Sequence, residues 1–216
     1  MSFLKVQRER GNLRKEITTL STVEVAKQGL NKLAFDQALN QSKKIKDIEE
    51  KVAFKKTHLP SFLPHALKYL ETGKVENETL LFTAALWCFD INDIDNAVNL
   101  SIFAIKQGLE TPTWFSTNIE QKFTYLFCEW ASPKINKGES VEPYLGQWLE
   151  AAEDWQEVND IQSGMLKVFA AKVAHQAKDY KTAVTLYEQA LEINSGAGVK
   201  TNLDLAKKEK EFVVKK

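Results

Sequence analysis

Apolar residues recur three and four positions apart along almost the whole chain. No segment alternates apolar and polar residues for long enough to indicate a β-strand, so the pattern predicts an all-α protein. Ser21 and Glu24 form a capping box, after which helical periodicity continues to about Lys56 with Gly29 as its weakest point. We therefore expect one long basic amino-terminal helix, or two helices joined near Gly29.

Proline, glycine and capping residues divide the rest of the chain into shorter helices. Pro60 and Pro64 end the long helix and open a short one that stops at Gly73. The later boundaries are marked by N-caps, stops and breakers: Asp93, Asp179, a Thr117/Glu120 capping box, Gly108, Ser132-Pro133 and Pro143. These signals predict helices over about residues 77–89, 93–107, 117–131, 142–156, 159–177, 180–193 and 198–213.

One pattern, Ala-Val-x-Leu-x-x-x-Ala, occurs twice, at residues 97–104 and 183–190. Alanines seven residues apart lie on one face of a helix and allow a neighbouring helix to approach closely. Such a face is typical of the second helix in tetratricopeptide-like hairpins. We therefore expect a body of helical hairpins with local tetratricopeptide-like character.

Charge is segregated along the chain, although 29 basic and 29 acidic residues cancel in total. Residues 1–56 carry 13 basic and 7 acidic side chains, residues 57–200 carry 11 and 19, and residues 201–216 carry 5 and 3. A basic arm of this kind is suited to a polyanion or to an acidic protein surface. Charge alone does not choose between these two partners, and it divides the chain into a basic arm at residues 1–56, an acidic body at 57–200 and a short charged tail at 201–216.

Three lysines of the arm are expected to form a stripe on the predicted long helix. At 100° per residue, Lys44, Lys51 and Lys55 fall within about 40° of each other. They lie beside an apolar seam of Ile45, Ile48 and Val52. Such a stripe can offer ammonium groups to phosphates. It can equally consist of lysines whose apolar stems cover the edge of a helix contact.

The residues that could carry chemistry form no recognisable catalytic pattern. Asp90, Asp93 and Asp95 are the densest carboxylate cluster, which fits either a magnesium site or a polar turn with Asp93 as N-cap. Cys88 and Cys128 lie in apolar segments without ligand spacing, so we expect two reduced core thiols. The sequence has no phosphate-binding glycine loop or nucleophile elbow, and we expect no catalytic residue, no metal ligand and no cofactor.

Several short segments follow one another in a distinctive order between about residues 30 and 205. They are Lys32-Leu33-Ala34-x-Asp36-Gln37, Leu59-Pro60-x-x-Leu63-Pro64, Leu70-Glu71-x-Gly73-Lys74, Leu86-Trp87-x-x-Asp90-x-x-Asp93-Ile94, Ala104-x-Lys106-x-Gly108-Leu109-x-x-Pro112, Gly138-Glu139-Ser140-Val141 and Ala197-Gly198-Val199-Lys200. Together they resemble the small terminase subunit of temperate contractile-tailed phages, which is often named the terminase endonuclease subunit.

This resemblance implies a role in packaging viral DNA. Small terminase subunits bind double-stranded viral DNA at the cohesive-end region, assemble as homo-oligomers and hand the DNA to a large subunit that carries the ATPase and the nuclease. On that reading residues 1–56 are a DNA-binding arm and residues 57–200 a body for oligomerisation and partner docking. The basic side chains that meet phosphates are then Arg8, Arg10, Arg14, Lys15, Lys44, Lys51, Lys55 and Lys56.

Two other functions fit the same residues. One is a tetratricopeptide-like adaptor that binds a protein, and the other is a metal-dependent endonuclease that uses Asp90, Asp93 and Asp95. No apolar run approaches the roughly 18 to 20 residues of a membrane span, and the first residues lack an apolar signal core. We therefore expect no membrane association and a cytoplasmic location, which the resemblance implies is the cytoplasm of the infected or lysogenic bacterial host.

Overall fold

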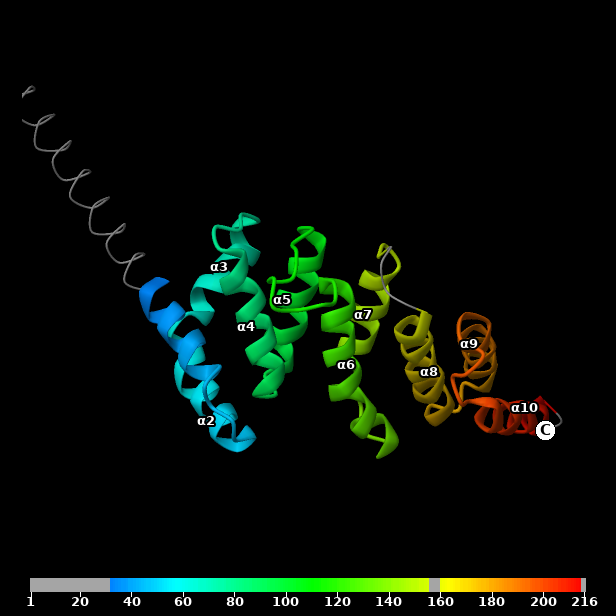
Figure 1. Cartoon of the computed structure of the whole chain (residues 1–216). Coiled ribbons are helices and arrows are strands. Elements are labelled where there is room, and N and C mark those ends of the chain that lie inside the picture. The colour runs from blue at the N-terminus through cyan, green and yellow to red at the C-terminus, as the bar shows by residue number, and fades with distance from the viewer. Residues whose placement is uncertain (1–31, 156–159, 215–216) are drawn as a thin grey trace, which may run out of the picture. The chain divides into compact units, whose positions relative to one another are not determined.

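The computed structural model describes residues 32–155 and 160–214, which form helices and connecting turns without a β-strand (Figure 1). The predicted all-α class is confirmed. The chain divides into two compact units, residues 1–65 and residues 66–216. The functional division predicted at residues 56 and 57 is not tested by this geometry and stays a prediction.

The first unit contains a helix over residues 32–42, helix α2 (Ile48–His58) and the 3-10 turn η1 (Leu59–Ser61). Phe35 and Phe62 are each 1% exposed, and their rings meet edge to face with centroids 5.1 Å apart. Leu59, the first residue of η1, is also buried. These apolar side chains tie the first helix to the residues that follow α2.

The prediction of one continuous helix up to Lys56 is wrong, because the helix is interrupted at residues 43–47. Asp47 has an extended backbone, and its carboxylate accepts a hydrogen bond from the Glu50 backbone N–H at 2.8 Å. The Ser42 hydroxyl donates to the Leu39 carbonyl oxygen at 3.0 Å in the last turn of the preceding helix. Asp47 thus acts as an N-cap and starts a new helix. The predicted joint near Gly29 lies outside the described residues.

The second unit is built of successive helices, and α3 (Leu63–Thr72) spans the boundary between the units. The remaining helices are α4 (Glu78–Asp90), α5 (Ile94–Lys106), α6 (Ile119–Asn136), α7 (Tyr144–Ala152), α8 (Asp160–Gln176), α9 (Tyr180–Ile193) and α10 (Lys200–Val214). Helix α4 packs on α5, α8 on α9, and α10 on α9. The predicted helices are therefore present, and the helical hairpins with them. A tetratricopeptide character is not confirmed.

Both predicted aspartate caps of the hairpins are confirmed. Asp93 accepts a hydrogen bond from the Asn96 backbone N–H at 3.4 Å, and Asp179 accepts one from the Thr182 backbone N–H at 3.2 Å. Hydrogen bonds from the Thr182 side chain and backbone hold the pKa of Asp179 below its ordinary value. These contacts explain why α5 and α9 begin where the sequence predicts.

Two predicted boundaries of α6 are wrong. Its N-cap is Asn118, whose side chain accepts from the Gln121 backbone N–H at 2.8 Å, and not Thr117. The helix also continues through Pro133 to Asn136. A proline inside a helix removes one backbone hydrogen bond. Burial of Ile135, which is 1% exposed, favours the last turn nonetheless.

Aromatic rings form the core of the second unit between α4 and α7. Trp148 is fully buried and stacks on Phe127 with ring centroids 4.8 Å apart, while its indole N–H donates to the Thr124 hydroxyl at 3.4 Å. Cys88 and Cys128 lie in the same core as free thiols, 0% and 2% exposed. Burial is the main cause that raises the pKa of each thiol to about 12. The prediction of two buried reduced thiols is confirmed.

Candidate nucleic-acid interface

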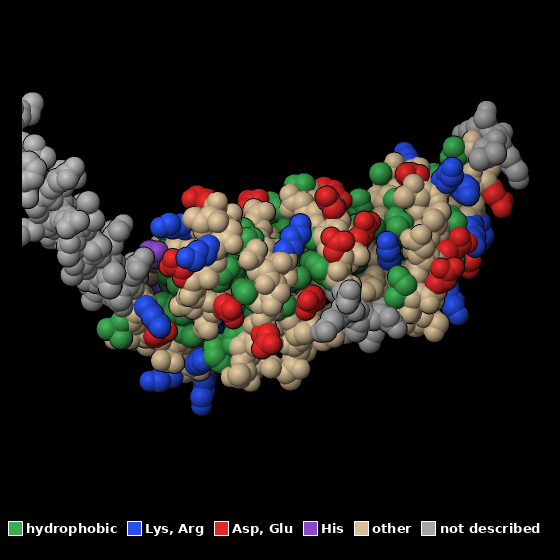
Figure 2. Space-filling view, turned by 90° about the horizontal axis from the view of Figure 1, so that it is seen from above, with side chains coloured by type: hydrophobic (Ala, Val, Ile, Leu, Met, Phe, Trp, Pro, Cys, Tyr) green, Lys and Arg blue, Asp and Glu red, His purple; other side chains and the backbone are tan. Residues whose placement is uncertain are grey.

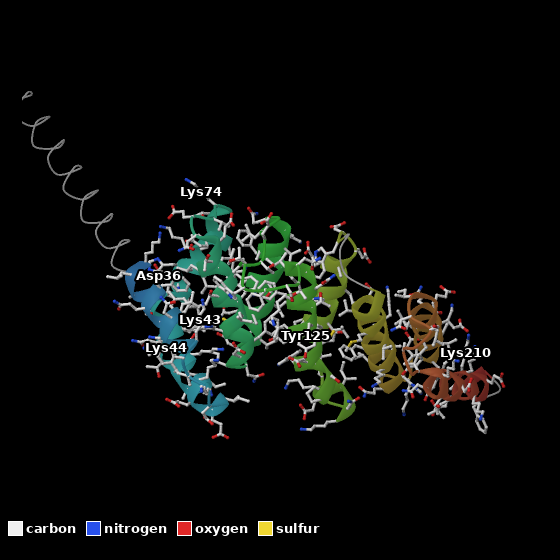
Figure 3. All side chains as sticks on the ribbon, viewed as in Figure 1. Asp36, Lys43, Lys44, Lys74, Tyr125 and Lys210 are labelled. Atoms are coloured by element: carbon white, nitrogen blue, oxygen red, sulfur yellow. The ribbon has the colours of Figure 1, made fainter. Side chains whose placement is uncertain are left out.

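Exposed lysines gather in the turn where the amino-terminal helix is interrupted. Lys43, Lys44 and Lys46 are all exposed in the segment between residue 42 and α2, and we call these three residues the lysine turn. Figure 3 labels Lys43 and Lys44 in this segment. Three exposed ammonium groups in one turn can contact the phosphates of a DNA backbone. Such contacts position a protein on DNA without reading its base sequence.

The predicted stripe of Lys44, Lys51 and Lys55 is not formed, because Lys44 lies in the turn and only the other two belong to α2. Lys51 is partly buried and Lys55 is only 8% exposed. Ile48, expected in an apolar seam beside the stripe, is 78% exposed. The spacing argument failed for Lys44 because it assumed that the helix is unbroken between Lys44 and Lys55.

The other predicted phosphate contacts fall into two groups. Lys56 is exposed near the carboxyl end of α2. The other four predicted contacts lie outside the described residues: Arg8, Arg10, Arg14 and Lys15. Sequence reasoning missed Lys43 and Lys46, although the Asp47-x-x-Glu50 capping box was a readable signal of a helix start beside them.

Charges on α2 also stabilise the helix itself. Its first turn carries Glu49 and Glu50, and its last turn carries Lys55 and Lys56. Acidic side chains near the amino end and basic ones near the carboxyl end complement the helix dipole. The basic end of α2 therefore has a structural role whether or not it meets DNA.

The residues around the predicted carboxylate cluster cap α5 and connect it to neighbouring helices. Asp95 accepts a hydrogen bond from the Tyr144 hydroxyl at 2.7 Å, and this bond is the main cause that raises the pKa of Tyr144. Asp93 caps α5, and the neighbouring Asn92 accepts from the Trp130 indole N–H at 2.9 Å. Within the described residues, no group of three or more His, Cys, Asp or Glu side chains is arranged to hold a metal ion.

Acidic and basic side chains are mixed on the face of the second unit seen in Figure 2. Residues 66–216 carry 16 basic and 22 acidic side chains, whereas residues 32–65 carry seven lysines and four acidic residues. The positive excess among the described residues thus lies in the first unit, where the lysine turn is found. None of the described helices is long and apolar enough to span a bilayer.

Residues 32–160 match the phage small terminase subunit family, and the chain belongs to that family. The chain is 26% identical over 186 residues to a protein of Haemophilus phage HP1 named "Probable terminase, endonuclease subunit". That alignment covers 80% of this chain and 66% of the phage protein. It is 29% identical over 196 residues to the "Terminase, endonuclease subunit" of Escherichia phage P2, covering 90% of this chain and 78% of that protein. No solved structure matches the chain.

Proposed function

We propose that this small terminase subunit recognises double-stranded viral DNA and assembles as a homo-oligomer with the large ATPase and nuclease subunit. The observation that carries the proposal is the family match over residues 32–160. The basic amino-terminal arm contacts phosphates, and the helical body mediates assembly. In this proposal the DNA cut belongs to the large subunit, and the protein acts in the cytoplasm of the bacterial host.

The lysine turn is the part of the proposed DNA surface that the described residues support best. Lys43, Lys44 and Lys46 are exposed, with exposed Lys56 further along the first unit. Lys55 is left out of this surface because its side chain is buried. Each lysine that contacts a phosphate releases a condensed counterion, so binding weakens as the salt concentration rises. Several arms in one oligomer bind far more tightly than one arm.

A charge-matched pair of variants tests the DNA surface. The first variant is Lys43→Gln, Lys44→Gln and Lys46→Gln. The control is Lys106→Gln, Lys137→Gln and Lys181→Gln, three exposed lysines of the second unit. If the lysine turn meets three phosphates, the slope of log affinity against log salt becomes shallower by about 2.7 in the first variant. Equal loss in both variants would mean that only net charge matters.

Assembly is tested separately by measuring the solution mass with light scattering, with and without a duplex that carries the cohesive-end site, at two salt concentrations. The proposal expects a multi-subunit particle that binds the duplex and releases it at the higher salt concentration. A monomer with no affinity for DNA would contradict it and favour a protein-binding adaptor.

A further inference from the structure

The two halves of helix α10 are held against the rest of the second unit in different ways. Helix α10 packs on α9 (Figure 1), and Leu203 and Ala206 belong to a buried cluster with side chains of α8 and α9. Beyond Ala206, the side chains of residues 207–213 are exposed except for Glu209, which is partly buried. Apolar packing therefore holds the first turns of α10. The last two turns, residues 207–214, which we call the distal segment, depend on other contacts.

Among the described residues, two polar contacts hold the distal segment. The Lys207 ammonium lies 2.8 Å from the Glu188 carboxylate of α9, and both side chains are about half exposed. The Glu209 carboxylate lies 2.6 Å from the Nε2 atom of His175 on α8. The exposed fractions of the Glu209 and His175 side chains are 39% and 17%. Because exposed ion pairs contribute little to stability, the more enclosed contact between His175 and Glu209 is the more important of the two.

The strength of this contact depends on the charge of His175. The rings of Tyr180 and Tyr187 meet the imidazole edge to face, with centroids 5.6 Å and 6.2 Å away, and they hold its orientation. A neutral imidazole that carries its proton on Nε2 donates a hydrogen bond to the carboxylate, and a protonated imidazole donates from the same atom. Protonation thus keeps the hydrogen bond and adds the attraction between opposite charges.

The charges around His175 are those of a cavity of about 500 Å³, which is lined by residues of α6, α8, α9 and α10. Lys172, whose ammonium donates to the Asn136 side-chain oxygen at 2.9 Å, and Lys178 supply two positive charges. Glu209 supplies the negative charge of the lining, and the other side chains of the lining are uncharged at neutral pH. Between about pH 5.5 and 8, lysine and glutamate keep their charges and tyrosine stays neutral, whereas histidine ordinarily loses its charge.

Only one of these charges moves with the distal segment. Lys172 belongs to α8 and Lys178 to the turn that follows it, so both stay beside His175 whether the distal segment is docked or not. They oppose a positive charge on the imidazole equally in the two states. Glu209 favours that charge only in the docked state, because it belongs to α10. The protonation of His175 is therefore coupled to docking of the distal segment through Glu209.

We propose that the contact between His175 and Glu209 is a pH-sensitive latch for the distal segment of α10. The segment is docked on α8 while His175 is protonated, and it detaches more often once His175 is neutral. Docking is strongest below about pH 6 and weakens as the pH rises through the range in which histidine loses its charge. Detachment removes Glu209 from the cavity wall, so the latch also controls how open the cavity is. This inference does not depend on the proposed function.

Backbone hydrogen exchange of the full chain tests the latch. Detached helical turns unwind because turns without packing are marginally stable in water, so the amides of residues 207–214 lose protection when the segment detaches. Protection is expressed relative to an unstructured chain at the same pH, which removes the effect of pH on exchange itself. Amides of α9 at residues 183–190 serve as the internal reference. We expect the relative protection of the distal segment to be about threefold lower at pH 8 than at pH 5.5.

Three variants assign this pH dependence to its groups. His175→Gln keeps a side-chain donor that cannot gain a charge, and Glu209→Gln removes the carboxylate. Each should abolish the threefold difference between the two pH values. Glu188→Gln is the matched control, because it breaks the other polar contact of the distal segment, to Lys207. It should lower protection by the same factor at both pH values and leave the threefold difference intact.

Equal protection of the distal segment at both pH values in the native chain would overturn the proposal. A pH dependence that persists in His175→Gln or in Glu209→Gln would also overturn it, because another group would then be responsible. Loss of the pH dependence in Glu188→Gln would move the effect to the wrong contact, with the same consequence. If His175→Gln lowers stability as a whole, Glu209→Gln still decides, because the Glu209 side chain is 39% exposed and leaves no cavity when it is replaced by glutamine.

Discussion

The α4/α5 and α8/α9 hairpins turn in the same way but differ in what surrounds them. Asn92 and Lys178 both have positive φ, 64° and 63°, and each is followed by an aspartate that caps the next helix. The aspartate backbone N–H groups reach back to the preceding helix at 2.8 Å and 2.9 Å. The repeated Ala-Val-x-Leu-x-x-x-Ala pattern falls on the second helix of each pair.

The neighbouring helices make the difference between the two hairpins. Around α4/α5, the side chains of Trp130 and Tyr144 donate to Asn92 and Asp95, so the polar groups beside the turn are paired. Around α8/α9, a cavity of about 500 Å³ remains open, and its lining includes Lys172, Lys178 and Tyr187. The repeated sequence pattern therefore determines the conformation of each turn. The helices packed around the hairpin differ between the two copies, and they determine whether the space beside it is filled.

The largest expected effect comes from removing the aromatic side chain that closes the first hairpin. Trp148 is fully buried and stacked on Phe127. Trp148→Ala should lower the free energy of unfolding by about 3–5 kcal/mol, because it removes buried apolar surface and leaves a cavity. Urea unfolding measures this loss. Trp114→Ala, at a site 50% exposed, serves as the control and should cost less than about 1 kcal/mol. Similar losses would contradict the closed core described here.

Alkaline pH should weaken the first hairpin region before the second, because Cys88 and Cys128 lie on α4 and α6. The pKa of each thiol is about 12 in the folded protein, so the unfolded chain loses these protons first. The contribution of the two thiols to the free energy of unfolding is then fully present below about pH 9, and it falls as the pH rises towards 12. From pH 7 to pH 10 the loss is about 1.4 kcal/mol for each thiol.

Urea unfolding at several pH values, combined with hydrogen exchange to localise the opening, measures this effect. The matched variant is Cys88→Ala with Cys128→Ala, which should flatten the pH dependence. An identical pH dependence in the variant would assign the loss to other groups.

The smallest expected effect distinguishes the two turns. Lys178→Gly should raise the free energy of unfolding by about 0.5–1 kcal/mol, because glycine adopts positive φ without strain. Asn92→Gly should instead lower it by about 0.5–1 kcal/mol, because asparagine tolerates this conformation and the change removes the acceptor of the Trp130 indole N–H. Urea unfolding measures both. The same sign at both sites would show that backbone conformation alone controls these turns.

Sequence reasoning succeeded where the signal was local. The caps at Asp93 and Asp179 and the stop at Gly108, where φ is 66°, each depend on a few adjacent residues. It failed at residues 43–47, because apolar periodicity continues across a break that Asp47 imposes. It also failed at Pro133, where burial of neighbouring side chains outweighs a breaker signal.

Neither the lysine turn nor the cavity could be predicted from the sequence, and the physical reasons differ. Exposure of Lys43 and Lys46 follows from the helix break, which the sequence marks only through the Asp47 cap. The cavity is assembled from α6, α8, α9 and α10, so its residues are far apart in the chain. No spacing rule brings Asn136 next to Lys172 before the helices pack.

The low reactivity of the two buried thiols also makes the protein suitable for site-selective labelling at an introduced cysteine. With a pKa of about 12, only about one thiol in 10⁵ is ionised at pH 7, against a few per cent for an ordinary cysteine. A dye that reacts with thiolates would therefore attach almost exclusively to a cysteine introduced on the surface, for example Lys44→Cys. Energy transfer between such dyes would report how far apart the arms of neighbouring subunits lie, without first removing either native cysteine.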